Sequence, residues 1–129
     1  MSIPETKLFD HDETSRLGWF GSESFAVRLP RDGIWLGMGR DRRFFDKLFW
    51  HVSGFRPGME DAFSVSGRRL DDAQSSSESL FSRATNAKLE HVGWSVLTGL
   101  GFSEPGCWEV TGSFNGQALT FVVSVEDAE

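Results

Sequence analysis

Hydrophobic and polar residues alternate along most of this chain, which is the pattern of β-strands that bury one face. The alternation is clearest near the C-terminus, where every second residue from Leu119 to Val125 is apolar. The dipeptide Asn115-Gly116 comes just before this run, and Asn-Gly readily adopts the positive φ angles of a two-residue hairpin turn. The pattern therefore predicts a β-hairpin within residues 104–126.

Weaker alternation predicts further strands before this hairpin. Their expected ranges are 23–29, 34–38, 47–53, 62–70, 78–84 and 92–102. Residues 1–16 are expected to form an acidic arm or an edge strand, and residues 77–91 could instead form a helix with a serine cap. Within these strands, Trp35 is expected on an outer face, Trp94 on the inner face, and Gly67 at a bulge.

Strands spaced by turns about ten residues apart predict an all-β fold, an immunoglobulin-like antiparallel β-sandwich of about seven to nine strands. The 129 residues suit one such domain. Immunoglobulin domains enter their penultimate strand through an acid-x-Gly-x-Tyr-x-Cys pattern, which Glu104 to Val110 follows with two changes. Trp108 takes the tyrosine position, Val110 takes the cysteine position, and Cys107 is expected on the opposite face.

The same hairpin resembles the closing hairpin of a group of bacterial cell-envelope proteins, often lipoproteins. These proteins end in G-C-W-E-V-T-G, a short turn and L-T-F-V-V, as residues 106–112 and 119–123 do here. Residues 18–21 (GWFG) and 66–71 (SGRRLD) are similar to segments of the same group. The resemblance implies an immunoglobulin-like fold and a location in the bacterial cell envelope, and it implies no particular activity.

Charge and composition narrow the classes of function. The chain has thirteen Lys and Arg residues and nineteen Asp and Glu residues. The resulting net charge of −6 argues against a general nucleic-acid binder. No apolar run is long enough for a membrane span, and the single cysteine excludes an internal disulfide. The first residues lack the basic start and apolar core of a signal peptide, which favours the cytoplasm. The resemblance favours the envelope or secretion instead, after removal of a signal peptide.

The segment from Arg40 to Arg56 concentrates arginines and aromatic side chains in an otherwise acidic protein. Arginine forks bind carboxylates and phosphates, and aromatic faces stack on rings, so this composition suits an anionic or saccharide ligand. The predicted ligand-binding surface consists of Arg42, Arg43, Phe44, Phe45, Trp50, Arg68 and Arg69. The alternative interpretation is a strand over 47–53 with Trp50 in the core, and with Arg68 and Arg69 in structural ion pairs with acids such as Asp71.

No catalytic, metal-binding or cofactor motif is recognisable in the chain. The three histidines, His11, His51 and His91, have no ligand spacing, and Cys107 has no base near it in the sequence. The sequence therefore predicts a non-enzymatic binding or structural module with an unknown protein, anionic or saccharide partner. The alternatives are an inhibitor or immunity-type protein that binds an enzyme through its loops, and a metal- or thiol-dependent enzyme.

Overall fold

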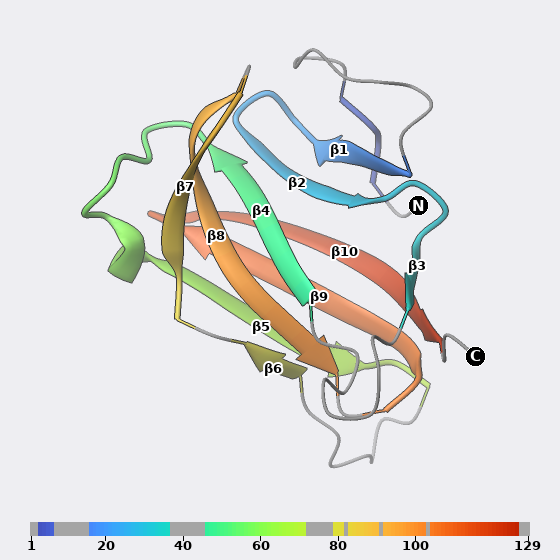
Figure 1. Ribbon diagram of the computed structural model, residues 1–129. Helices are drawn as coiled ribbons and strands as arrows, with labels where there is room; N and C mark the ends of the chain where they lie inside the picture. The colour runs from blue at the N-terminus through green and yellow to red at the C-terminus, as the bar shows by residue number, and fades with distance from the viewer. Residues whose placement is uncertain are drawn as a thin grey trace.

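Two β-sheets packed face to face make up the described part of the chain (Figure 1). The computed structural model describes residues 3–6, 16–36, 46–71, 79–81, 83–90, 92–102 and 104–126. The front sheet of Figure 1 has the order β1-β2-β4-β8-β6, with β7 also paired to β8, and the back sheet has the order β3-β10-β9-β5. The strands are β1 (Leu17–Gly21), β2 (Phe25–Pro30), β3 (Ile34–Leu36), β4 (Asp46–Val52), β5 (Phe63–Arg69), β6 (Ser79–Phe81), β7 (Thr85–Leu89), β8 (Gly93–Phe102), β9 (Gly106–Phe114) and β10 (Gln117–Glu126).

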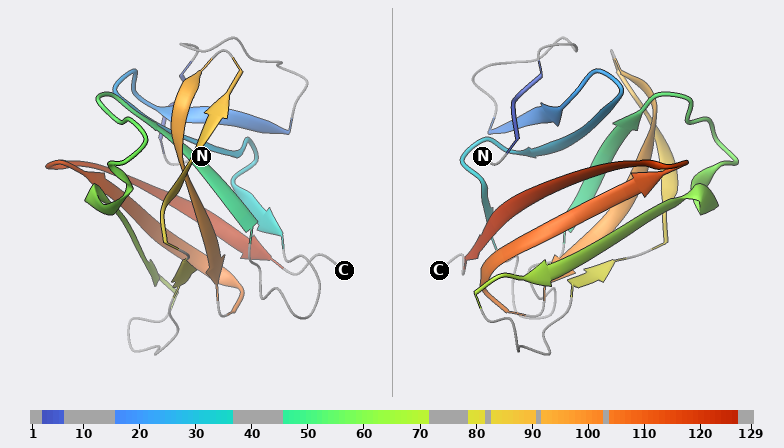
Figure 2. Two further views of the ribbon diagram at one scale, coloured as in Figure 1. Left: turned by 60° about the vertical axis from the view of Figure 1, so that its left-hand side comes forward. Right: turned by 180° about the vertical axis from the view of Figure 1, so that it is seen from behind.

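The strand order is that of an immunoglobulin-like sandwich, as the sequence predicts. Strands β2-β4-β8-β6 occupy the A-B-E-D places of one sheet, and β5-β9-β10 occupy the C-F-G places of the other. After β2 the chain turns at Pro30–Gly33, where Gly33 has a φ of 76° and its N–H bonds the Pro30 carbonyl at 3.0 Å. This turn carries the chain to the back sheet, where β3 pairs parallel to β10, while the other strand pairs among the described residues are antiparallel. The view from behind in Figure 2 shows the back sheet in front of the other sheet.

The closing hairpin forms as predicted. Strands β9 and β10 pair without a break. The ladder runs from the pair Phe114 and Gln117, beside the turn, to the pair Gly106 and Val125 at its other end. Asn115 and Gly116 both have positive φ, 48° and 82°, which is the geometry that Asn-Gly favours in a two-residue turn.

The core between the sheets is centred on the Trp50 side chain of β4. Its indole ring lies 5.1 Å from the Phe63 ring and 5.9 Å from the Phe121 ring, centroid to centroid, and Trp50 is fully buried. Trp50 Nε1 donates to Thr98 Oγ1 at 3.1 Å, so the polar end of the indole is satisfied inside the core. Opposite the ring, β9 has Gly112, where an added Cβ would lie 2.5 Å from Trp50 Cζ3.

Trp108 occupies the corner position that immunoglobulin domains give to tyrosine. It is fully buried, and its Nε1 donates to the Glu104 carbonyl, four residues upstream, at 3.0 Å. This bond back to the chain just before the strand is the one that the tyrosine hydroxyl makes in those domains. The predicted replacement of tyrosine by Trp108 is confirmed, and Cys107 is exposed on the other face, also as predicted.

Three sequence predictions differ from the structure: the side of Trp35, the bulge at Gly67 and the number of strands. Trp35 is buried and packs edge-on to Phe102 at 5.5 Å, because parallel pairing puts it beside the inward-facing Val125. Strands β5 and β9 pair continuously through Gly67, so no bulge forms there. Of the two alternatives for residues 77–91, the strand is confirmed, since the described residues there include β6 and β7. With β1 and β7 added, ten strands are found in the described ranges instead of seven to nine. Most of the arm or edge strand expected over residues 1–16 lies outside those ranges.

We expect the substitution Gly112→Ala to destabilise the domain by about 1–3 kcal/mol, the range for an overpacked core. The new methyl group would meet the rigid indole of Trp50, which the surrounding rings prevent from moving. Urea unfolding measures the effect, and the Trp50→Phe background is the matched control. The cost of Gly112→Ala should fall clearly in that background; an equal cost in both backgrounds would contradict direct contact as its cause.

Candidate binding surface

The described residues do not assemble the ligand-binding surface that the sequence predicts. Trp50 is fully buried between the sheets and cannot stack on a ligand, so this part of the prediction is wrong. The alternative interpretation, a strand with Leu48, Trp50 and Val52 in the core, is confirmed by β4. Arg42, Arg43, Phe44 and Phe45 lie outside the described residues.

Arg68 and Arg69 lie in the described part, and both are held by acids of β9 or of the turn before it. Arg68 Nε lies 3.0 Å from Glu109 Oε1 on the outer face of the back sheet. Arg69 Nη1 lies 2.6 Å from Glu104 Oε1, and its Nε donates to the Pro105 carbonyl at 3.0 Å. The expected ion pairs therefore exist, but with Glu109 and Glu104 as partners.

Asp71, the partner that the sequence suggested, binds backbone instead. Both of its carboxylate oxygens lie 3.2 Å from the N–H of Cys107. Gly106 packs so closely here that a Cβ would lie 2.6 Å from Arg69 Nε. Arg68 and Asp71 thus tie the end of β5 to β9, and Arg69 ties it to the turn before β9, which is a structural role.

The groups considered for metal or thiol chemistry are not brought together in the described part of the chain. His51 is half-buried on β4, and its Nε2 lies 3.2 Å from the Glu23 carbonyl, while His11 and His91 lie outside that part. No group of three or more His, Cys, Asp or Glu side chains there could hold a metal ion. Cys107 is exposed on β9 in the back sheet, whereas His51 lies on β4 in the front sheet.

The feature that stands out instead is the β7–β8 hairpin, which carries an exposed tryptophan. Trp94 is 45% exposed, whereas the other four tryptophans are at most 6% exposed. It lies directly opposite Lys88 in the ladder between β7 and β8. The end of the hairpin extends past the strands of the back sheet (Figure 1).

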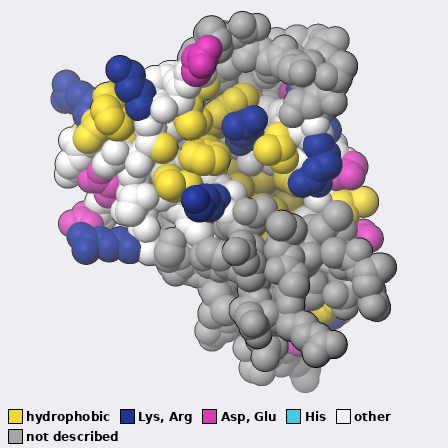
Figure 3. Space-filling view, viewed as in Figure 1, with side chains coloured by type: hydrophobic (Ala, Val, Ile, Leu, Met, Phe, Trp, Pro, Cys, Tyr) yellow, Lys and Arg dark blue, Asp and Glu magenta, His cyan; other side chains and the backbone are white. Residues whose placement is uncertain are grey.

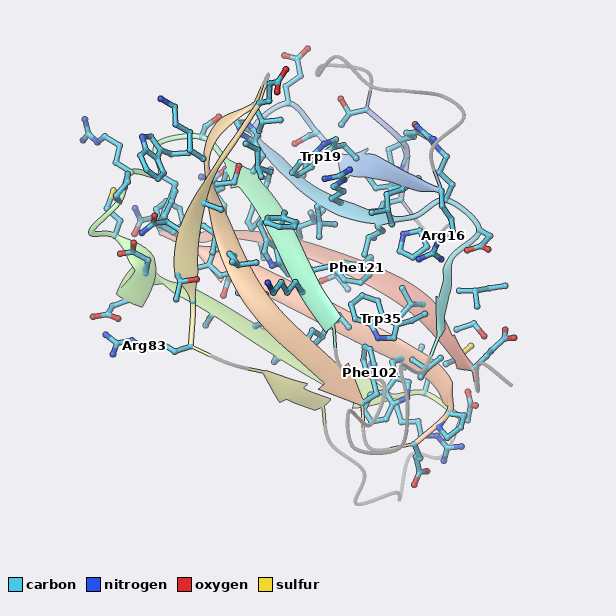
Figure 4. All side chains as sticks on the ribbon, in the orientation of Figure 1. Arg16, Trp19, Trp35, Arg83, Phe102 and Phe121 are labelled. Atoms are coloured by element: carbon cyan, nitrogen blue, oxygen red, sulfur yellow. The ribbon has the colours of Figure 1, made fainter. Side chains whose placement is uncertain are left out.

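The other side of the hairpin is anchored to the front sheet. Leu89 and Val92 pack, with Phe49, against a small apolar cluster of Trp19 and Ala26 on the outer face. The turn is closed by the Val92 N–H bonding the Leu89 carbonyl at 3.2 Å, and Gly93 supplies a φ of 96°. Figure 4 shows Trp19 at β1, near the end of the hairpin. This packing holds the hairpin in place while Trp94 and Lys88 face solvent.

An open groove of about 610 Å³ follows the hairpin end and is lined by Lys88, Leu89, Glu90, Val92 and Gly93. The groove is mostly open to solvent, so it is a surface depression rather than an enclosed small-molecule site. Lys88 and Glu90 give it one charge of each sign. Figure 3 shows that hydrophobic side chains on this face of the molecule are bordered by Lys and Arg side chains, despite the net negative charge of the chain.

Sequence reasoning placed Trp94 in the core because it shares a face with Val96, Thr98 and Leu100. The face is assigned correctly, since those three residues are at most 2% exposed. Alternation indicates which way a side chain points, but not where the opposite sheet ends. The sequence carried no signal for this exposure, because Lys88 pairs with Trp94 only in the β7–β8 ladder and β7 was not predicted.

Comparisons with protein-family models, curated proteins and solved structures found no match for this chain. Within the described ranges, no helix has the length and apolar character needed to cross a membrane.

Acid should weaken the domain through His51. Burial lowers the pKa of His51 below its ordinary value of 6.5, and the bond to the Glu23 carbonyl only partly opposes this. The unfolded chain therefore takes up the proton first, so stability falls as pH drops through about 6.5 and levels off below the folded-state pKa. Urea unfolding from pH 8 to pH 5 should show the wild type losing its advantage over His51→Gln as pH falls. A constant difference across this range would contradict the effect.

Proposed function

We propose that this protein is a non-enzymatic binding module that contacts its partner through Trp94 and the adjoining groove of the β7–β8 hairpin. The observation that supports this is the exposure of Trp94, 45%, in a chain whose other tryptophans are all buried. Indole offers a large rigid apolar face and an N–H donor, and tryptophan is enriched among residues that dominate binding energy. Nearly half of this surface is left in water by the fold.

Two further properties of the hairpin suit binding. The Leu89 and Val92 contacts with the Trp19 cluster hold the hairpin before a partner arrives, which reduces the entropy lost on association. Lys88, exposed and opposite Trp94, adds a cation beside the ring. A saccharide ring or an anionic group next to an apolar surface fits this pair, because the indole stacks and the ammonium group donates.

A protein partner is the second candidate. The hairpin projects beyond the back sheet (Figure 2), a shape that suits insertion into the cleft of another protein. An inhibitor or immunity-type protein would use it in this way. The cell-envelope location stays a prediction, and fractionation of cells that produce the full-length protein tests it.

We expect Trp94→Ala to weaken binding at least about 10-fold, a free-energy change of roughly 1.4 kcal/mol. Isothermal titration calorimetry with a saccharide or an anionic oligosaccharide provides the assay, because it measures binding without relying on the fluorescence of the residue that is replaced. Leu70→Ala is the matched control, because Leu70 is similarly exposed at 42% but lies after β5. Both variants should unfold at nearly the wild-type midpoint.

The same two variants test a protein partner in a pull-down experiment. The partner should be lost with Trp94→Ala and retained with Leu70→Ala. Equal binding by the two variants, for every ligand or protein that the wild type binds, would contradict a role for the hairpin.

A further inference from the structure

The two sheets leave a cavity between them along one side of the sandwich, away from the groove at the hairpin end. It has a volume of about 170 Å³ and opens between β5 and the segment that leads into β7. Strands β5 and β7 belong to different sheets and are not paired with each other. The lining residues are Glu60, Asp61, Phe63, Ser64, Val65, Arg83, Ala84 and Thr98.

Polar side chains bridge the two sides of this opening. Arg83 Nη2 lies 3.0 Å from Asp61 Oδ1, and both side chains are more than 80% exposed, which places this pair at the mouth. Figure 4 shows Arg83 extending outward from the chain before β7. Asn86 Nδ2 donates to Glu60 Oε2, and this bond is the main reason that the pKa of Glu60 is lowered. Glu60 is therefore ionised at neutral pH.

Thr98 forms the floor of the cavity and supplies an unused hydrogen-bond donor. Thr98 is 2% exposed, and its Oγ1 accepts the bond from Trp50 Nε1. A hydroxyl group also has a proton to donate, and no acceptor for it is found among the described residues. Buried donors are rarely left unpaired because desolvation without a partner is costly. The acceptor for the Thr98 proton must then come from whatever occupies the cavity.

The remaining walls restrict the chemistry of an occupant. Phe63, Val65 and Ala84 make the interior largely apolar. Two carboxylates against one guanidinium give the mouth a net negative charge, which disfavours an anion. The volume is close to that of an engineered apolar cavity of about 150 Å³ that binds benzene.

We propose that this cavity is a binding site for a small uncharged molecule, about the size of a six-membered ring, that carries one oxygen acceptor. The ring fills the space between Phe63, Val65 and Ala84, and the oxygen accepts the hydrogen bond from Thr98. The site is separate from the Trp94 surface, so either can fail without the other. It also places the ligand next to the Trp50 indole, through the shared Thr98 oxygen.

Cyclohexanone is the probe, and methylenecyclohexane, which has the same shape without an acceptor, is its control. In ¹H–¹⁵N spectra of the whole protein, cyclohexanone should cause a saturable shift of the Trp50 indole N–H signal, which is assigned by its loss in Trp50→Phe. Methylenecyclohexane should bind at least about 10-fold more weakly, since one hydrogen bond to a buried donor is worth roughly that factor.

Two variants at the floor complete the test. Thr98→Val keeps the volume and removes the donor, and should weaken cyclohexanone binding about 10-fold, whereas Thr98→Ser keeps the hydroxyl and should bind within about threefold of wild type. If Thr98→Val does not fold, the comparison of cyclohexanone with methylenecyclohexane on the wild-type protein tests the role of the Thr98 hydroxyl. Absence of a saturable shift, equal binding of both probes, or equal binding by Thr98→Val would overturn the proposal and leave water as the partner of Thr98.

Discussion

The packing of Trp50 against Gly112 is the contact on which the rest of the sandwich depends. Stacked sheets lie about 10 Å apart, and an indole that points from one sheet toward the other fills most of that distance. The facing strand must then have no side chain at that point, which is what Gly112 provides. Thr98 is needed as well, since it accepts the indole N–H bond inside an otherwise apolar core.

This contact joins the same two strands that a disulfide joins in antibody domains. Strand β4 occupies the B place and β9 the F place, and the inter-sheet disulfide of those domains connects B with F. Here the only cysteine, Cys107, lies on β9 but points outward. Aromatic packing from Trp50, supported by Phe63 and Phe121, links the two sheets without a covalent bond. Among the described residues, seven buried phenylalanines belong to this core.

How much the sequence could predict depended on whether a feature is local. The closing hairpin and the Trp108 corner were predictable, because Asn115-Gly116 and the alternation of β9 and β10 act over a few residues. The side on which Trp35 lies was not, because it depends on parallel pairing with Val125 of β10, ninety residues away in the sequence. The partners of Arg68 and Arg69 were also not predictable, since Glu109 and Glu104 come next to β5 only when the sheet forms.

The candidate sites were the hardest to predict because both depend on where one sheet stops covering the other. Sheets in a sandwich are twisted and cross at an angle of about 30°, so their edges and corners cannot coincide everywhere. Trp94 is exposed because β8 continues past the back sheet, and the Thr98 cavity forms because β5 and β7 approach without pairing. Both residues occupy inward-facing positions of β8 that would belong to the core if the back sheet covered them completely. Instead, Trp94 keeps exposed apolar surface and Thr98 keeps a hydroxyl proton without an acceptor among the described residues. The residues of one strand that share a face with Val96 thus change from core to candidate site within a few positions, according to what lies opposite them.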